Sequence, residues 1–137
     1  MGLFDMFKSE PVKLTARLAL PVGLLFMMAS DGDIESEEIG QLQSVVGGDE
    51  EAINTAIRYL RAVKYEQFLK EAAAILSPQQ KLCFLINMAD SLLADGRAEA
   101  SEQQAFSKAL SQFGMTEENF SRYFETIAIK NNRSIFY

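Results

Sequence analysis

The sequence contains no histidine and only one cysteine, and both scarcities restrict its chemistry. Without histidine, the chain cannot form a Ser–His or Cys–His nucleophile pair or a histidine-containing zinc site. Cys83 cannot form a disulfide within the chain. Its stretch is expected to be a buried helix, where a free thiol behaves as a small hydrophobic side chain. We therefore expect a protein that is not an enzyme, has no catalytic residues and works in the reducing cytoplasm.

Runs of basic residues and long apolar runs are also missing. The formal net charge is -6, from 13 basic and 19 acidic side chains. Nucleic acid is excluded as a partner, because its phosphates need clustered Lys and Arg. The most apolar stretch, residues 18–29, is too short to cross a bilayer. It has a counterpart at residues 82–93, so we interpret it as a core helix and not as a targeting signal.

The chain has the length and composition of one globular domain. Its 137 residues can bury roughly two thirds of their unfolded surface. Apolar residues recur at helical spacing, and no stretch alternates polar and apolar residues as a strand does. The predicted fold is a compact all-α domain of about seven helices, built from two helix-loop-helix repeats. We divide the chain into an apolar N-terminal segment (1–10), a helical domain (11–130) and a C-terminal tail (131–137).

Capping residues predict where the helices begin. Ser9 and Pro11 indicate the first start, and a kink or break is expected near residues 17–21 because Pro21 removes a backbone donor and Gly23 adds to the effect. Five later starts are expected at Ser36, Asp49, Ser77 with Gln80, Ser101 with Gln104, and Thr116.

Two glycines are expected to end helices. Gly47 would end a helix whose core face includes Leu42 and Val45, and Gly114 would end the helix that starts near residue 101. The apolar run 62–76 fits either a separate helix or a bent continuation of the helix that starts at Asp49.

An acidic turn occurs twice, 64 residues apart. The stretch Ser-Asp-Gly-Asp-Ile-Glu-Ser-Glu-Glu at residues 30–38 is matched by Ala-Asp-Gly-Arg-Ala-Glu-Ala-Ser-Glu at residues 94–102. Apolar positions on both sides agree at the same offset, for example Leu18 with Leu82 and Leu42 with Phe106. The pattern therefore indicates two copies of one helix-loop-helix unit, each with an Asp-Gly turn.

This double pattern resembles the tellurite-resistance TerB family over about residues 12–130. The resemblance implies a compact seven-helix intracellular protein of bacteria, linked to stress response. It also implies that acidic residues around the two turns bind a divalent cation such as Ca²⁺, Mg²⁺ or Mn²⁺. Five metal-ligand candidates follow: Asp31, Glu38, Asp90, Asp95 and Glu102. The second turn departs from the first, since Arg97 and Ala98 stand where the first has Asp33 and Ile34.

The same acidic residues also have a purely structural explanation. Asp before Gly makes a good turn, and glutamates at a helix N-terminus are stabilised by the helix dipole. Asp90 and Asp95 lie near a helix C-terminus, where the dipole disfavours carboxylates. They need a nearby cation, which is either Lys or Arg, with Arg97 close in sequence, or a metal ion.

A calcium-binding EF-hand is excluded for the first turn. Its sixth position is Ser36 where glycine is required, and its twelfth is Leu42 where a bidentate glutamate is required.

Two functional hypotheses follow. The first is a TerB-like stress-response protein that binds a divalent cation at the paired turns. The second is an interaction module without metal, which recruits a protein partner through its acidic surface and its apolar ends. Those ends contain Leu3, Phe4 and Phe7 at one terminus and Ile135, Phe136 and Tyr137 at the other. The N-terminal group is expected to dock on the domain, with a partner or peripheral membrane contact as the alternative. The tail either folds back or binds something, and the oligomeric state stays open.

Overall fold

The computed structural model describes residues 12–29, 40, 42–45, 47, 49–94 and 99–137. Over this part of the chain the regular structure is entirely helical, and the all-α prediction with about seven helices is confirmed. Residues 40 and 42–45 are helical as well. The elements with complete bounds are α1 (Ala16–Ala29), α3 (Glu50–Ala62), α4 (Tyr65–Ile75), α5 (Pro78–Ala94), α6 (Ala100–Gln112), α7 (Glu117–Asn131) and the 3₁₀ helix η2 (Arg133–Phe136).

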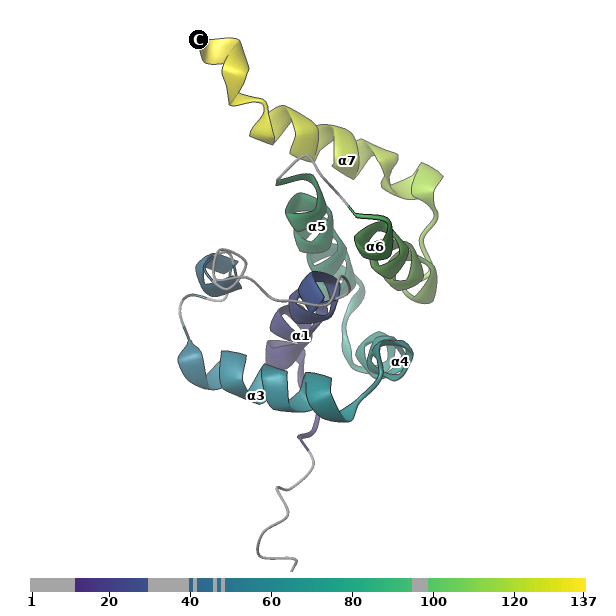
Figure 1. Ribbon diagram of the computed structural model, residues 1–137. Coiled ribbons are helices and arrows are strands. Elements are labelled where there is room, and N and C mark those ends of the chain that lie inside the picture. Colours follow the sequence, from purple (N-terminus) through teal and green to yellow (C-terminus); the bar gives the residue numbers. More distant parts are fainter. Residues whose placement is uncertain (1–11, 30–39, 41, 46, 48, 95–98) are drawn as a thin grey trace, which may run out of the picture.

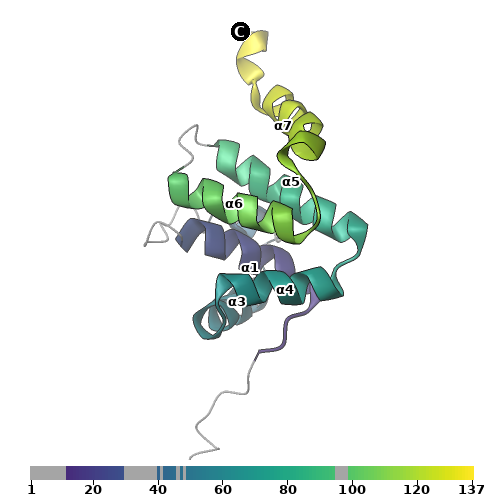
Figure 2. The same ribbon diagram turned by 90° about the vertical axis from the view of Figure 1, so that its right-hand side faces the viewer.

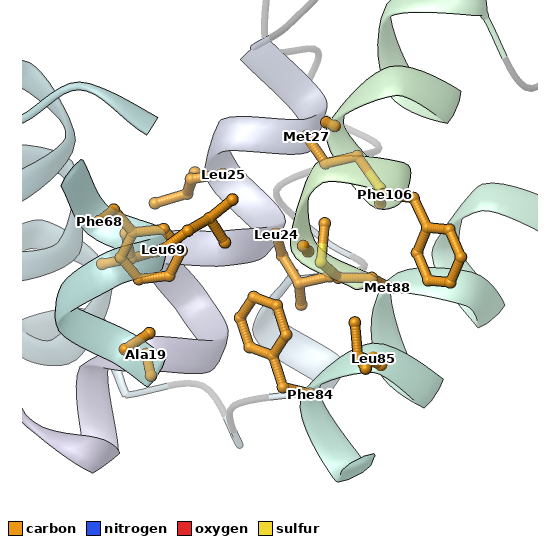
Figure 3. Packing of buried hydrophobic residues seen from close by; sticks show 14 of the residues in the cluster. Ala19, Leu24, Leu25, Met27, Phe68, Leu69, Phe84, Leu85, Met88 and Phe106 are labelled. Atoms are coloured by element: carbon orange, nitrogen blue, oxygen red, sulfur yellow. The ribbon is translucent and has the colours of Figure 1, made fainter. Parts of the chain in front are cut away.

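Helix α1 lies at the centre of the fold (Figures 1 and 2) and contacts α3, α4, α5 and α6. Nine of its fourteen residues are buried, as expected for a helix that is apolar on all sides. Around it, side chains from α1 and from α3 to α7 form one core, in which Leu24, Phe68, Phe84, Met88 and Phe106 lie together (Figure 3). Helix α7 packs mainly on α5 and adds Phe120 and Ile127 to the core.

Most of the predicted helix caps are confirmed. The Ala52 amide donates a hydrogen bond to the Asp49 carboxylate (3.1 Å) at the start of α3. Ser77 and Gln80 form a reciprocal capping box at the start of α5, with donor–acceptor distances of 2.8 and 3.1 Å. The Thr116 hydroxyl accepts from the Asn119 amide at 3.1 Å and so caps α7.

Gly114 ends α6 as predicted. Its φ is +78°, and the Met115 amide donates to the Leu110 carbonyl at 3.0 Å while the Gly114 amide donates to Ser111 at 3.0 Å. These two bonds make a Schellman motif. The 62–76 run is a separate helix, α4, because Val63 and Lys64 adopt extended backbone between α3 and α4.

Three predictions about helix starts and helix breaks are wrong. Residues 12–15 are not helical, so α1 begins at Ala16 and not near Pro11. Pro21 lies inside an unbroken helix, because only one backbone bond, to the Arg17 carbonyl, is lost there, close to the helix N-terminus. Ser101 is not a cap, since Glu99 occupies that position without a side-chain bond. The good helix former Ala100 lets α6 start earlier.

Gly23 has a different role from the one predicted. A Cβ atom at this position would lie 2.3 Å from the Cε2 and Cζ atoms of Phe84 on α5. The missing side chain therefore lets the Phe84 ring lie directly against the backbone of α1.

Two side chains predicted to be buried are exposed. Cys83 is exposed because it lies roughly 170° from the centre of the buried stripe of α5, at 100° per residue. Val45 is 37% exposed, since it lies in the last turn before Gly47, whose φ is +76°. Leu42 of that helix is fully buried.

Candidate functional site

A groove of about 530 Å³ lies between α5, α6 and α7, and we call it the α5–α6–α7 groove. Its apolar lining comes from all three helices: Leu92, Leu93, Phe106 and Phe124. Leu92 and Phe106 are buried, whereas Leu93 is 37% exposed. The wall is built by an aromatic cluster in which the Phe106 and Phe124 ring centroids lie 5.3 Å apart. The groove therefore offers apolar surface to a ligand from solvent.

Polar side chains complete the lining of this groove. Glu117 and Glu125 are exposed residues of α7 that line it. No ion pair joins either carboxylate to another of the described residues. The groove thus combines an apolar floor with an acidic rim.

Asp90 lies on α5, where it holds the end of α7. Lys130 Nζ lies 3.0 Å from one carboxylate oxygen, and Asn131 Nδ2 lies 2.9 Å from the other. Burial by itself disfavours the charged carboxylate, but the hydrogen bonds from Asn131 and Lys130 outweigh it and lower the pKa of Asp90 below its ordinary value of 3.8. Asp90 therefore has the compensating cation that the sequence required, and the cation is Lys130.

The other four metal-ligand candidates are not brought together by the described structure. Asp31, Glu38 and Asp95 lie outside the described residues. Glu102 lies in the first turn of α6 and is half-buried. Among the described residues no three acidic or cysteine side chains are grouped as metal ligands would be. The divalent-cation site at the paired turns stays a prediction.

Comparison with known families identifies the chain. The family model described as tellurite resistance protein TerB matches residues 17–125, from the first turn of α1 into α7. The chain belongs to the TerB family. No curated protein and no solved structure matched this TerB-family chain. No helix in the described residues is long and apolar enough to cross a membrane.

The TerB match stops at Glu125, before the most exposed large apolar side chains among the described residues. In the C-terminal tail, Ile135 is 68% exposed, Phe136 is 82% exposed and Tyr137 is fully exposed. The tail continues from α7 and points away from the helices of the core (Figures 1 and 2). It does not fold back on the described part of the domain, and it presents three large apolar side chains to solvent.

A second, smaller pocket of this TerB protein lies between α1, α3 and α5 and measures about 310 Å³. The ion pair between Arg17 and Asp49 closes one side of it. The hydrogen bond from the Ala52 amide, followed by the one from Arg17, lowers the pKa of Asp49. The exposed Cys83 lies in its wall. Because Asp49 caps α3 and its charge is balanced by Arg17, these polar groups serve the fold.

Sequence reasoning missed the α5–α6–α7 groove altogether. Helical periodicity describes one helix at a time, whereas a groove depends on how three helices are spaced. Glu117 and Glu125 gave only a weak signal, because eight positions on one helix place them roughly 80° apart around its axis, at 100° per residue. The tail was identified, because three consecutive apolar residues after a polar stretch can be seen without a structure.

Proposed function

We propose that this TerB-family protein is a non-catalytic, cytoplasmic interaction module of the bacterial stress response, and that it binds a protein partner through its C-terminal tail. The observation that carries the proposal is the exposure of Ile135, Phe136 and Tyr137 at the end of the chain. Aromatic side chains are enriched at protein interfaces and supply much of the binding energy there. The absence of histidine supports the non-catalytic part of the proposal.

The proposal is tested by capturing partners with the full chain and with a chain lacking residues 133–137. This truncation keeps Lys130 and Asn131, so the contact between α7 and α5 is preserved. A matched control is Ile129→Ser, which changes a side chain 73% exposed that lies on α7 before the tail. We expect the truncated chain to lose its specific partners and the control to retain them. Identical sets of partners for all three proteins would refute a binding role for the tail.

We propose as a second function the binding of a divalent cation at the two Asp-Gly turns. Its support is the repeated acidic pattern and the family resemblance, through Asp31, Glu38, Asp95 and Glu102. The fifth candidate, Asp90, is already balanced by Lys130 and needs no metal.

A thermal melt of metal-stripped protein with millimolar Ca²⁺, Mg²⁺ or Mn²⁺ tests this second function. A cation present at a hundred times its dissociation constant would add ~2.7 kcal/mol to the free energy of unfolding. In a domain of this size the melting temperature would rise by roughly 5 to 10 °C. The shift should disappear in Asp31→Asn/Asp95→Asn. If no ion raises the melting temperature of the wild type, the turns are helix-capping structures only.

A further inference from the structure

We propose that the partner of the tail is a second copy of this chain, with the tail of each copy docked in the α5–α6–α7 groove of the other. The inference rests on the proposed function, in which the tail is the binding element. It adds which protein is the partner and which of its surfaces receives the tail.

The first argument is the apolar match between the two surfaces. The tail presents Ile135, Phe136 and Tyr137, and the groove presents Leu93 and Phe124 above its buried floor. A groove of about 530 Å³ has the size of sites that enclose drug-sized ligands, so it can accept aromatic side chains.

The second argument is charge. Residues 126–137 contain two of the thirteen basic side chains, Lys130 and Arg133, and none of the nineteen acidic ones. Lys130 is paired with Asp90, whereas no ion pair joins Arg133 to another described residue. The rim of the groove carries Glu117 and Glu125. An acidic protein therefore ends in a basic, apolar segment that complements its own acidic, apolar groove.

The third argument is that the tail leads away from the groove of its own copy. Seven residues of α7 separate Phe124 from Asn131 and span roughly 10 Å. Asn131 and Lys130 fix this end of α7 on Asp90, and η2 then continues outward (Figure 2). To enter its own groove, the tail would have to unwind η2 and reverse direction at Asn132. A second copy can receive it without either change.

Reciprocal exchange gives a closed, two-fold dimer, because the same tail and the same groove are used twice. Two aromatic side chains and an isoleucine can bury roughly 500 Å² in each tail. The exchange buries two such tails, and so twice the apolar area of a single tail–groove contact.

The experiment measures self-association of the full chain by sedimentation equilibrium, over roughly 1 µM to 1 mM, where a weak dimer dissociates. Two charge-reversal variants are compared: Arg133→Glu in the tail and Glu117→Lys/Glu125→Lys at the rim. In a dimer of either variant, the tail and the groove that receives it carry charges of the same sign and repel each other. We therefore expect the dissociation constant of each dimer to rise by roughly tenfold or more. In an equimolar mixture both tail–groove pairs are complementary again, and association should return to near the wild-type level. Glu118→Lys, an exposed α7 residue that does not line the groove, is the matched control and should leave the dimer unchanged.

Two results would overturn the inference. One is a wild-type chain that stays monomeric over the whole range. The other is a dimer that both charge reversals leave intact, or that the mixture fails to restore. Neither result decides the proposed function, because partner capture by the full and truncated chains tests the tail independently of self-association.

Discussion

Replacing Gly23 with alanine should destabilise the protein, although alanine is the better helix former. The new Cβ would lie 2.3 Å from two ring carbons of Phe84, whereas non-bonded carbons pack at about 3.5 to 4.0 Å. The ring cannot easily withdraw, because Phe84 is 2% exposed and packs against Phe113 with centroids 5.3 Å apart. Helices α1 and α5 would have to separate, at the centre of the core.

The magnitude is the difference between two opposing effects. An alanine in the interior of a helix is favoured over glycine by ~1 kcal/mol. Overpacking a core costs ~1–3 kcal/mol, and a clash with two atoms belongs in the upper half of that range. The net loss is about 1 to 2 kcal/mol of unfolding free energy, equivalent to a fall in melting temperature of roughly 4 to 8 °C for a domain of this length.

The assay is thermal and urea unfolding of Gly23→Ala, Phe84→Leu and the double variant. Leucine lacks the two ring atoms that clash, so the double variant should be more stable than the sum of the single effects predicts. Gly40→Ala is the matched control. Gly40 is helical and exposed, and a Cβ there meets no described atom within 4 Å, so stability should rise by ~0.5 to 1 kcal/mol. If Gly23→Ala is as stable as Gly40→Ala, the close packing of Phe84 on α1 is wrong.

Three further outcomes are expected. Gly114→Ala should cost ~1 kcal/mol in urea unfolding, because alanine is strained at the φ of +78°; an unchanged midpoint would contradict the Schellman turn. Ser77→Ala should lower the free energy of unfolding by ~1 kcal/mol, because it removes the cap of α5. The control Ser111→Ala, at an exposed site in the last turn of α6, should lower it by less than about 0.5 kcal/mol. Equal losses would rule out the capping box. The lowered pKa of Asp90 implies that its contribution to stability is complete above pH 3.8 and is lost as the pH falls through its folded-state pKa. The stability difference between wild type and Asp90→Asn should therefore shrink from about pH 7 to about pH 3, and a constant difference would show that the bond to Lys130 does not depend on charge.

The sequence was most informative where a local rule acts alone. Ser77, Thr116 and Gly114 were assigned correctly because capping depends on residues three or four positions away. Cys83 was assigned wrongly because a mostly apolar helix gives little sign of which side faces the core. Val45 was assigned wrongly for a similar reason, since its exposure depends on where the chain leaves the helix.

The candidate site also has one part that the local sequence predicts and another that depends on the packing of distant segments. The tail was found because it is contiguous in the sequence. The sequence left the cation beside Asp90 open between a Lys or Arg, such as Arg97, and a metal ion. The structure supplies Lys130 from 40 positions away. The α5–α6–α7 groove is made by three helices, and its shape depends on the spacing between them. No single stretch of sequence carries that spacing.

The position of α1 at the centre also affects how the protein is made. Helix α1 is apolar on nearly every side, yet the helices that cover it follow it in the chain, and α6 ends at Gln112. A ribosome adding ~5–20 residues per second needs roughly 4 to 17 s to proceed from Ala29 to Gln112. Throughout that interval the most hydrophobic segment of the nascent polypeptide has no complete set of partners. The order of the helices therefore leaves apolar surface of α1 open to aggregation until α6 has been made.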